Sequence, residues 1–146
     1  MSECILQAEN LSKHWGGLKA LNEFNIKFYD KSLHSIVGPN GAGKSTFMNI
    51  VLGLLKPDFG NIFLGNSNLT NLAIHERSKL GIAYLPQQIS IFRGLTVYEN
   101  LLAIAQIVIK GEAEQKEVVE QLMAEFSITH LRDVKALTLS GGERRR

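Results

Sequence analysis

The sequence predicts an α/β fold in which strands come early and helices fill the second half of the chain. Phe24, Ile26 and Phe28 alternate with polar residues, which is typical of a strand with one buried face. Residues 38–43 form a glycine-rich segment between a short apolar run and a helical pattern. The chain has 146 residues, of which 45% are apolar and 21% charged, so its composition is that of one globular domain.

The other strands are expected in the first 86 residues. Residues 33–37 are an apolar run that ends at a glycine, which favours a buried strand, and residues 61–64 favour another. Between them, apolar residues recur at helical spacing and predict a helix from residue 44 to about residue 55. Three shorter features complete this half: a turn at residues 56–60, a helix at residues 73–80 stopped by Gly81, and a strand at residues 82–85 closed by Pro86.

Two helices are expected in the second half. Thr96 and Glu99 have the spacing of a capping box, in which the threonine hydroxyl accepts from the third amide and the glutamate reaches back. A helix should follow from residue 97 to about residue 110, and another from about residue 113 to residue 126. One face of the second helix is expected to carry three apolar residues: Val118, Leu122 and Phe126.

The charge and cysteine content exclude several classes of protein. The net charge of +2 comes from the arginines at the end of the chain, so no basic stripe indicates a nucleic-acid partner. Cys4 is the only cysteine, which excludes an internal disulfide and favours a reduced, intracellular setting. The apolar stretch at residues 101–109 is too short to span a bilayer, so no direct membrane insertion is expected. The four histidines lack ligand spacing, and no metal site built from them is expected.

A phosphate-binding motif, G-x-x-x-x-G-K-[ST], begins at Gly38. Its glycines let successive backbone N–H groups point inward, and the helix that follows adds its unpaired N-terminal amides. Lys44 would then reach the β- and γ-phosphates, and the Ser45 hydroxyl would join the shell of a Mg²⁺ ion. The expected nucleotide-binding residues are Gly38, Pro39, Asn40, Gly41, Ala42, Gly43, Lys44, Ser45 and Thr46.

A second motif, LSGGE, lies near the end of the sequence and reads as the start of a helix. Its serine hydroxyl and glycine amides would point along the helix axis, where they can donate to a phosphate group. The residues of the motif are Leu139, Ser140, Gly141, Gly142 and Glu143.

With these two motifs in this order, the whole chain resembles the nucleotide-binding domain of ABC transporters. Residues 38–46 are similar to the Walker A loop and residues 139–143 to the ABC signature. Tyr84-Leu85-Pro86-Gln87 resembles the approach to the Q-loop, with Gln87 as its glutamine, which positions water and Mg²⁺ in the family. Trp15 stands where the family has the A-loop aromatic residue that stacks on adenine. One departure is local: Lys31-Ser32 stands where the family usually has Gly-Glu.

The resemblance implies a P-loop NTPase fold of the ABC ATPase type. Such a fold has a parallel core sheet with flanking helices, an antiparallel β subdomain and a helical subdomain. On this basis residues 1–86 are expected to form the nucleotide-binding core, residues 87–139 the Q-loop and helical subdomain, and residues 139–146 the signature region.

The resemblance also implies a mechanism and partners. Two such domains form a homodimer that sandwiches two ATP molecules with Mg²⁺, each nucleotide touching the Walker A loop of one subunit and the signature of the other. The dimer works with transmembrane permease subunits, on the cytoplasmic side of the bacterial inner membrane. The segment after the Q-loop contacts the permease in this family, which makes Ile91, Phe92 and Arg93 the candidate partner contacts.

Within the family, LPQQISIFRGLTVYENL and the ending GERRR are most similar to the ATPases of lipopolysaccharide export systems. The branched-chain amino acid uptake ATPases are the alternative. A non-transport ABC ATPase of DNA repair or translation would share both motifs, although such proteins usually carry long insertions or tandem domains.

The family's Walker B strand, catalytic glutamate, D-loop and switch histidine lie beyond the signature and do not occur within these 146 residues. The chain is therefore expected to be incomplete at its C-terminal end and to hydrolyse ATP poorly by itself, which leaves a non-catalytic remnant as a further alternative. Without the Walker B strand, an apolar sheet edge would be open, so poor folding or aggregation is expected. A cooperative melt of a soluble monomer would contradict that expectation.

Overall fold

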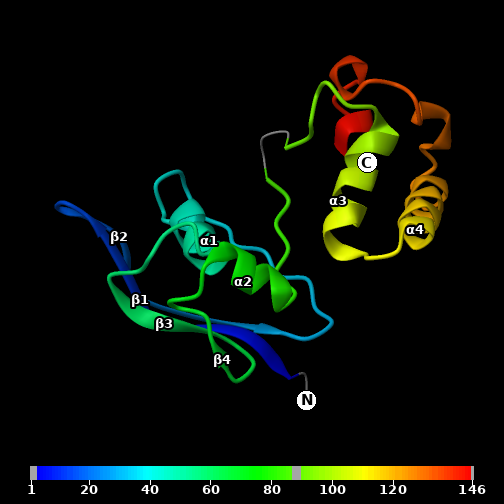
Figure 1. Cartoon of the computed structure of the whole chain (residues 1–146). Coiled ribbons are helices and arrows are strands. Elements are labelled where there is room, and N and C mark those ends of the chain that lie inside the picture. Colours follow the sequence, from blue (N-terminus) through cyan, green and yellow to red (C-terminus); the bar gives the residue numbers. More distant parts are fainter. Residues whose placement is uncertain (1–2, 87–89, 146) are drawn as a thin grey trace. The chain divides into compact units, whose positions relative to one another are not determined.

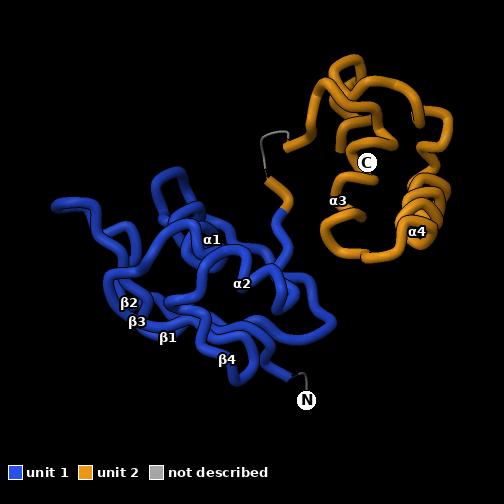
Figure 2. The backbone as a smooth tube through the Cα atoms, in the orientation of Figure 1, with its two compact units in different colours: residues 1–84 blue, residues 85–146 orange. Residues whose placement is uncertain are grey.

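Two consecutive segments of the chain form separate units, Met1–Tyr84 and Leu85–Arg146 (Figure 2). The structure is a computed structural model that describes residues 3–86 and 90–145. No helix among these residues has both the length and the apolar character needed to cross a membrane.

The first unit is built on a four-stranded antiparallel sheet (Figure 1). Its strand order is β2-β1-β3-β4, so the long hairpin of β1 and β2 forms one side and β3 pairs with the other edge of β1. The expected strands around residues 24–28 and 61–64 are confirmed. The strands are β1 (Cys4–Trp15), β2 (Leu18–Tyr29), β3 (Phe59–Leu64) and β4 (Ser67–Asn68).

Helices α1 (Lys44–Leu52) and α2 (Ile74–Lys79) lie on one side of this sheet (Figure 1). The core of the unit joins the inner face of the sheet to α1, since Phe47 and Ile50 pack in the same buried cluster as Ile62 of β3. Phe24, Ile26 and Phe28 of β2 are partly buried against this cluster, as their alternation predicts. Burial of this apolar surface fixes the helix that follows the glycine-rich loop on the sheet.

The predicted strands at residues 33–37 and 82–85 are wrong. Both segments lack regular secondary structure and have no sheet pairing, and Leu33 and Val37 are 98% and 90% exposed. A strand needs a neighbour for its ladder of hydrogen bonds, and none of the described residues pairs with either segment. The parallel core sheet therefore does not form among the described residues, whose only sheet is antiparallel. The α/β class holds through the antiparallel sheet and its helices.

A residue in the left-handed backbone region follows β2. Lys31 has φ 54°, a conformation that glycine adopts without strain and other residues adopt rarely. This is the position at which the sequence departs from the Gly-Glu of the ABC family. Hydrogen bonds stabilise the turn, since the Ser32 hydroxyl donates to the Tyr29 carbonyl oxygen at 2.5 Å and lies 2.7 Å from Nε2 of His34.

The second unit is helical, and it contains α3 (Val97–Val108) and α4 (Glu112–Glu125) as an antiparallel pair joined by a short connection (Figure 1). The predicted capping box of α3 is confirmed, because Thr96 Oγ1 accepts from the Glu99 amide at 3.1 Å and Glu99 Oε2 accepts from the Thr96 amide at 2.7 Å. Three single turns of 3₁₀ helix follow: η1 (Thr129–Leu131), η2 (Ala136–Thr138) and η3 (Glu143–Arg145).

The fully buried face of α4 differs from the predicted one. It consists of Gln115, Val119 and Met123, whereas Phe126 is 48% exposed. Gln115 is accommodated in the core because its side-chain amide donates to the Ile109 carbonyl oxygen at 2.7 Å. The spacing of apolar residues in the sequence does not reveal this face, because one of its positions is a glutamine.

Candidate functional site

The glycine-rich loop precedes α1 and depends on two glycines with positive φ. Gly41 and Gly43 both have φ 86°, in the region that residues with a Cβ rarely adopt. Gly43 also packs against β2 so closely that a Cβ there would lie 2.3 Å from the carbonyl oxygen of Ala20. Its place in the motif is therefore required by the fold of the loop itself.

Lys44 is the first residue of α1, and its side chain turns back over the loop. Its ammonium donates to the carbonyl oxygens of Gly38 and Pro39, both at 2.7 Å. A cation whose partners are exposed carbonyl oxygens at a helix N-terminus is available to a phosphate, which offers charged acceptors in their place. The positive end of the helix dipole adds to the same attraction.

A cavity of about 290 Å³ connects the loop to the end of the β1–β2 hairpin. Trp15 ends β1, next to the turn at Gly16 and Gly17, and its side chain is 54% exposed. The structure thus brings the predicted aromatic residue and the phosphate-loop motif to one cavity, although Trp15 and Gly43 are 28 positions apart in the sequence. Its lining consists of Trp15, Leu18, Ala20, Asn40, Gly41, Gly43, Lys44, Ser45 and Thr46.

Arg77 of α2 supports the opposite end of α1, and the sequence reasoning did not single it out. Arg77 is 2% exposed, and its guanidinium donates to two carbonyl oxygens in the last turn of α1, those of Ile50 and Val51, at 2.5 and 2.7 Å. It also donates to the carbonyl oxygens of Leu72 and Thr70. Burial lowers the pKa of Arg77, yet its ordinary value is so high that the group remains charged. A cation therefore sits at the negative end of the helix whose positive end carries Lys44.

The LSGGE motif forms a second capping box, in the helical unit. The Ser140 hydroxyl oxygen accepts from the Glu143 amide at 3.3 Å, and Glu143 Oε2 accepts from the Ser140 amide at 2.7 Å. Because the hydroxyl acts as an acceptor within the turn, its own proton stays available to an outside acceptor. Gly141 and Gly142 have open space where a Cβ would lie.

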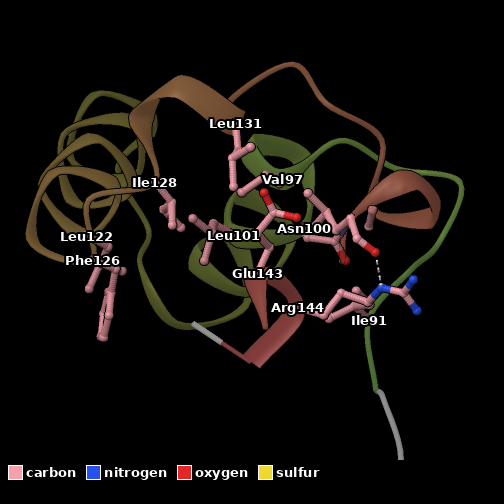
Figure 3. A pocket seen from close by; sticks show the side chains of 12 residues that line it. Ile91, Val97, Asn100, Leu101, Leu122, Phe126, Ile128, Leu131, Glu143 and Arg144 are labelled. Carbon is pink, nitrogen blue, oxygen red and sulfur yellow. Dashed lines mark hydrogen bonds between the residues drawn. The ribbon is translucent and has the colours of Figure 1, made fainter. Parts of the chain in front are cut away.

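Leu139 and Arg144 anchor this turn in the helical unit. Leu139 is 6% exposed and belongs to the buried cluster of the unit, while Arg144 Nε donates to its carbonyl oxygen at 2.7 Å (Figure 3). Both residues line an apolar cavity of about 160 Å³ between α3, the end of α4 and the motif. Figure 3 shows Leu101, Leu122 and Ile128 around it.

The candidate partner contacts lie on a loop whose backbone is hydrogen-bonded to Asn100 of α3. Asn100 accepts from the Phe92 amide at 2.8 Å and donates to the Phe92 carbonyl oxygen at 3.0 Å. Phe92 is nevertheless 61% exposed, Arg93 is exposed, and Ile91 lines the apolar cavity. An exposed aromatic side chain on a backbone held this firmly is suited to contact with another protein. Asn100 was not predicted, because an asparagine inside a helix gives no such signal in the sequence.

The predicted residues therefore occupy both units. The phosphate loop and Trp15 share a cavity in the first unit, and the LSGGE motif and Phe92 loop belong to the second. The predicted Gln87 lies outside the described residues.

Comparisons with known proteins agree with the motifs. A family model described as "ABC transporter" matches residues 21–146. Over 142 residues the chain is 44% identical to the lipopolysaccharide export system ATP-binding protein LptB of Escherichia coli (strain K12), covering 97% of this chain and 59% of that protein. The chain thus spans less than two thirds of that relative's length.

Two solved structures are similar along nearly the whole chain. The ATP-binding cassette MJ1267 of an ABC transporter, in its ADP conformation, is 33% identical, with a TM-score of 0.80 over 99% of this chain and 62% of that one. A dimeric post-hydrolysis state of the ATP-binding cassette MJ0796, bound to ADP and Pi, is 26% identical, with a TM-score of 0.79 over 97% of this chain and 66% of that one.

Proposed function

This chain belongs to the ABC transporter family, and we propose that it is the ATP-binding part of a transporter that exports lipopolysaccharide. The observation that carries the proposal is the cavity in which the glycine-rich loop and Trp15 meet. Its loop side offers amides and a cation to phosphates, and its other side offers an aromatic ring to a base. Similarity to the E. coli export protein favours lipopolysaccharide over branched-chain amino acids as the substrate.

The residues around this cavity fit ATP. Lys44 would exchange its loop carbonyls for the β- and γ-phosphates, and the adenine would stack on Trp15. The Ser45 hydroxyl, on the same wall, would join the shell of Mg²⁺, and Gln87 would complete that shell and orient water. Bound MgATP supplies the phosphoryl bond whose hydrolysis drives transport. The residues of this chain bind the nucleotide, neutralise its charge and fix its orientation.

The LSGGE motif would act on a nucleotide held by a second copy of the chain. Its turn exposes the Ser140 hydroxyl proton and leaves Gly141 and Gly142 open to close approach by a ligand. ATP would then hold two subunits together, and its hydrolysis would release them. The dimeric form of the MJ0796 cassette supports this arrangement.

The Phe92 loop is the surface proposed for a transmembrane permease. Phe92 and Arg93 would enter a groove of that partner while Asn100 keeps their backbone in place. The chain would accordingly be located at the cytoplasmic face of the bacterial inner membrane, bound through the permease.

A binding measurement tests the nucleotide-binding role. Because Trp15 is the only tryptophan, its fluorescence on titration with MgATP reports directly on the cavity. Lys44→Ala is expected to weaken binding more than about tenfold and to abolish retention on an ATP resin, because a charge-assisted contact to phosphate is lost. Lys79→Ala, an exposed lysine of the same unit, is the control. Equal binding by both variants would overturn the proposal.

A chimera tests the substrate. The matching part of the E. coli protein is replaced by this chain, and lipopolysaccharide at the cell surface is measured after depletion of the native protein. The chimera is expected to restore delivery, and its Lys44→Ala version is not. A chimera that binds ATP and assembles with the permease without restoring delivery would show that the substrate is a different one.

A further inference from the structure

The ring of Trp15 has a cation over one of its faces. Lys13 and Trp15 are two positions apart on β1. The Lys13 ammonium lies over the indole, 5.3 Å from the ring centroid. Lys13 is outside the set of residues that line the nucleotide cavity, whereas Trp15 belongs to it. The ammonium therefore holds the ring without occupying the space next to the phosphate loop.

Asp58 fixes that ammonium from the segment before β3. One carboxylate oxygen accepts from Lys13 Nζ at 2.7 Å, and the other accepts from the backbone amide of His14, also at 2.7 Å. The Asp58 amide in turn donates to the Ser12 carbonyl oxygen at 2.9 Å. Asp58 thus binds three consecutive residues of β1, and the next residue along the strand is Trp15.

The charges of this pair are partly shielded from water. The side chains of Lys13 and Asp58 are 14% and 32% exposed, compared with 54% and 79% for Lys116 and Glu112. The hydrogen bond from Lys13, followed by that from the His14 amide, lowers the pKa of Asp58, so the carboxylate is ionised at neutral pH. The Asp58 carboxylate is consequently charged under the conditions in which a nucleotide would bind.

We propose that Lys13 and Asp58 are positioning residues that orient the Trp15 ring as a platform for the nucleobase. The inference rests on the proposed function and adds the residues that set the base-dependent part of nucleotide affinity. A half-exposed indole on a hairpin end has rotamer freedom that binding would have to remove. The cation over one face reduces that freedom in advance and leaves the cavity-lining part of the ring for the base.

The test distinguishes the contribution of the base to nucleotide affinity from that of the phosphates. Affinities for MgATP and for inorganic triphosphate, which has no base, are measured by calorimetry on the same protein. Lys13→Met and Asp58→Asn are expected to weaken MgATP about two- to fivefold, with the triphosphate affinity unchanged. Asp58→Asn retains an acceptor for the His14 amide. Lys13→Arg is the conservative control: it retains the cation and is expected to bind MgATP as the wild type does.

Matched controls keep the outcomes distinct. Lys116→Met removes a different ion pair, an exposed one with Glu112 at 2.6 Å in the helical unit, and should change neither affinity. An unchanged MgATP affinity in Lys13→Met, or an equal loss for both ligands, would overturn the positioning role alone. If the wild-type chain binds neither ligand, the proposed function fails and the inference fails with it.

Discussion

At the scale of single residues, the two left-handed glycines of the phosphate loop have different reasons to be glycine. Gly41 and Gly43 share φ 86°, but a Cβ on Gly41 would meet nothing within 4 Å. A Cβ on Gly43 would meet the Ala20 carbonyl oxygen at 2.3 Å and Leu21 Cδ2 at 3.0 Å. Since the nearest atom belongs to the backbone of β2, it has no flexible side chain that could move away.

Gly41→Ala is therefore expected to cost about 1 kcal/mol of unfolding free energy, the strain of the left-handed conformation. Gly43→Ala is expected to cost more than about 2 kcal/mol, because the loop must also separate from β2. It should also weaken MgATP binding more than Gly41→Ala does. Urea unfolding and nucleotide titration of the two variants check this order, and equal costs would contradict the close contact with Ala20.

Phe92 gives a prediction about transport at the same scale. It is 61% exposed on a backbone held by Asn100, so its truncation removes contact surface and leaves the fold intact. In the chimera with the E. coli protein, Phe92→Ala is expected to abolish lipopolysaccharide delivery and to preserve basal ATP hydrolysis. Delivery at the wild-type level would rule out the coupling role.

Among the individual residues, those in local motifs are the ones the sequence predicts. Lys44 and Ser140 belong to motifs whose hydrogen bonds connect neighbours in the chain, so their spacing is informative. Arg77, Asn100 and Asp58 act across 26, 8 and 44 positions on backbone atoms of other segments. The backbone amides and carbonyl oxygens that bind these side chains leave no mark in the sequence, which is why the three supports emerge only from the fold.

At the scale of elements, α1 is shorter than its apolar pattern predicts, and Arg77 accounts for the difference. Gly53 ends the helix with φ 80°, and a Cβ at this position would lie 2.9 Å from Nε of Arg77. The guanidinium donates to the carbonyl oxygens of Ile50 and Val51, which would accept from the amides of a further helical turn. α1 therefore ends at Leu52, and the predicted extension to residue 55 is wrong.

Arg77→Met is expected to lower the free energy of unfolding by about 3 kcal/mol, because the Val51 carbonyl oxygen loses its guanidinium donor and the Ile50 carbonyl oxygen keeps only the Gly53 amide. Lys79→Met on the same helix removes an exposed charge and should change stability by less than about 0.5 kcal/mol. Urea denaturation of both variants measures the difference. Similar stabilities would mean that water replaces the guanidinium at the helix end.

Whether an element was predicted correctly depends on how far along the chain its hydrogen-bond partners lie. The capping boxes of α3 and of the LSGGE turn form within four residues, and so the sequence contains all of their parts. The apolar runs at residues 33–37 and 82–85 have strand composition, yet strand formation depends on a distant pairing partner. Without pairing among the described residues, composition alone does not make them strands.

At the scale of the molecule, the phosphate loop belongs to one unit and the LSGGE turn to the other. The proposed composite site of two copies would use the loop of one copy and the serine of its partner. Each copy therefore contributes to two sites, one through its loop and one through its serine, and either contribution can be removed separately.

Two variants remove these contributions. Lys44→Ala removes the loop cation, and Ser140→Asp would place a negative charge against the γ-phosphate. Aspartate is itself a helix N-cap residue, so the capping box of the turn is retained. Ser140→Asn, which caps without a charge, is the control.

Mixing the two variants distinguishes a composite site from a site within one chain. Alone, either variant has two defective composite sites per dimer and is expected to remain monomeric with MgATP. A mixed dimer contains one site with both defects and one with neither, so MgATP is expected to restore a dimer to the mixture. Analytical ultracentrifugation with and without MgATP measures this mass change, and the Ser140→Asn control should dimerise more readily than Ser140→Asp. If the mixture stays monomeric while the wild type dimerises, the two-copy site is wrong.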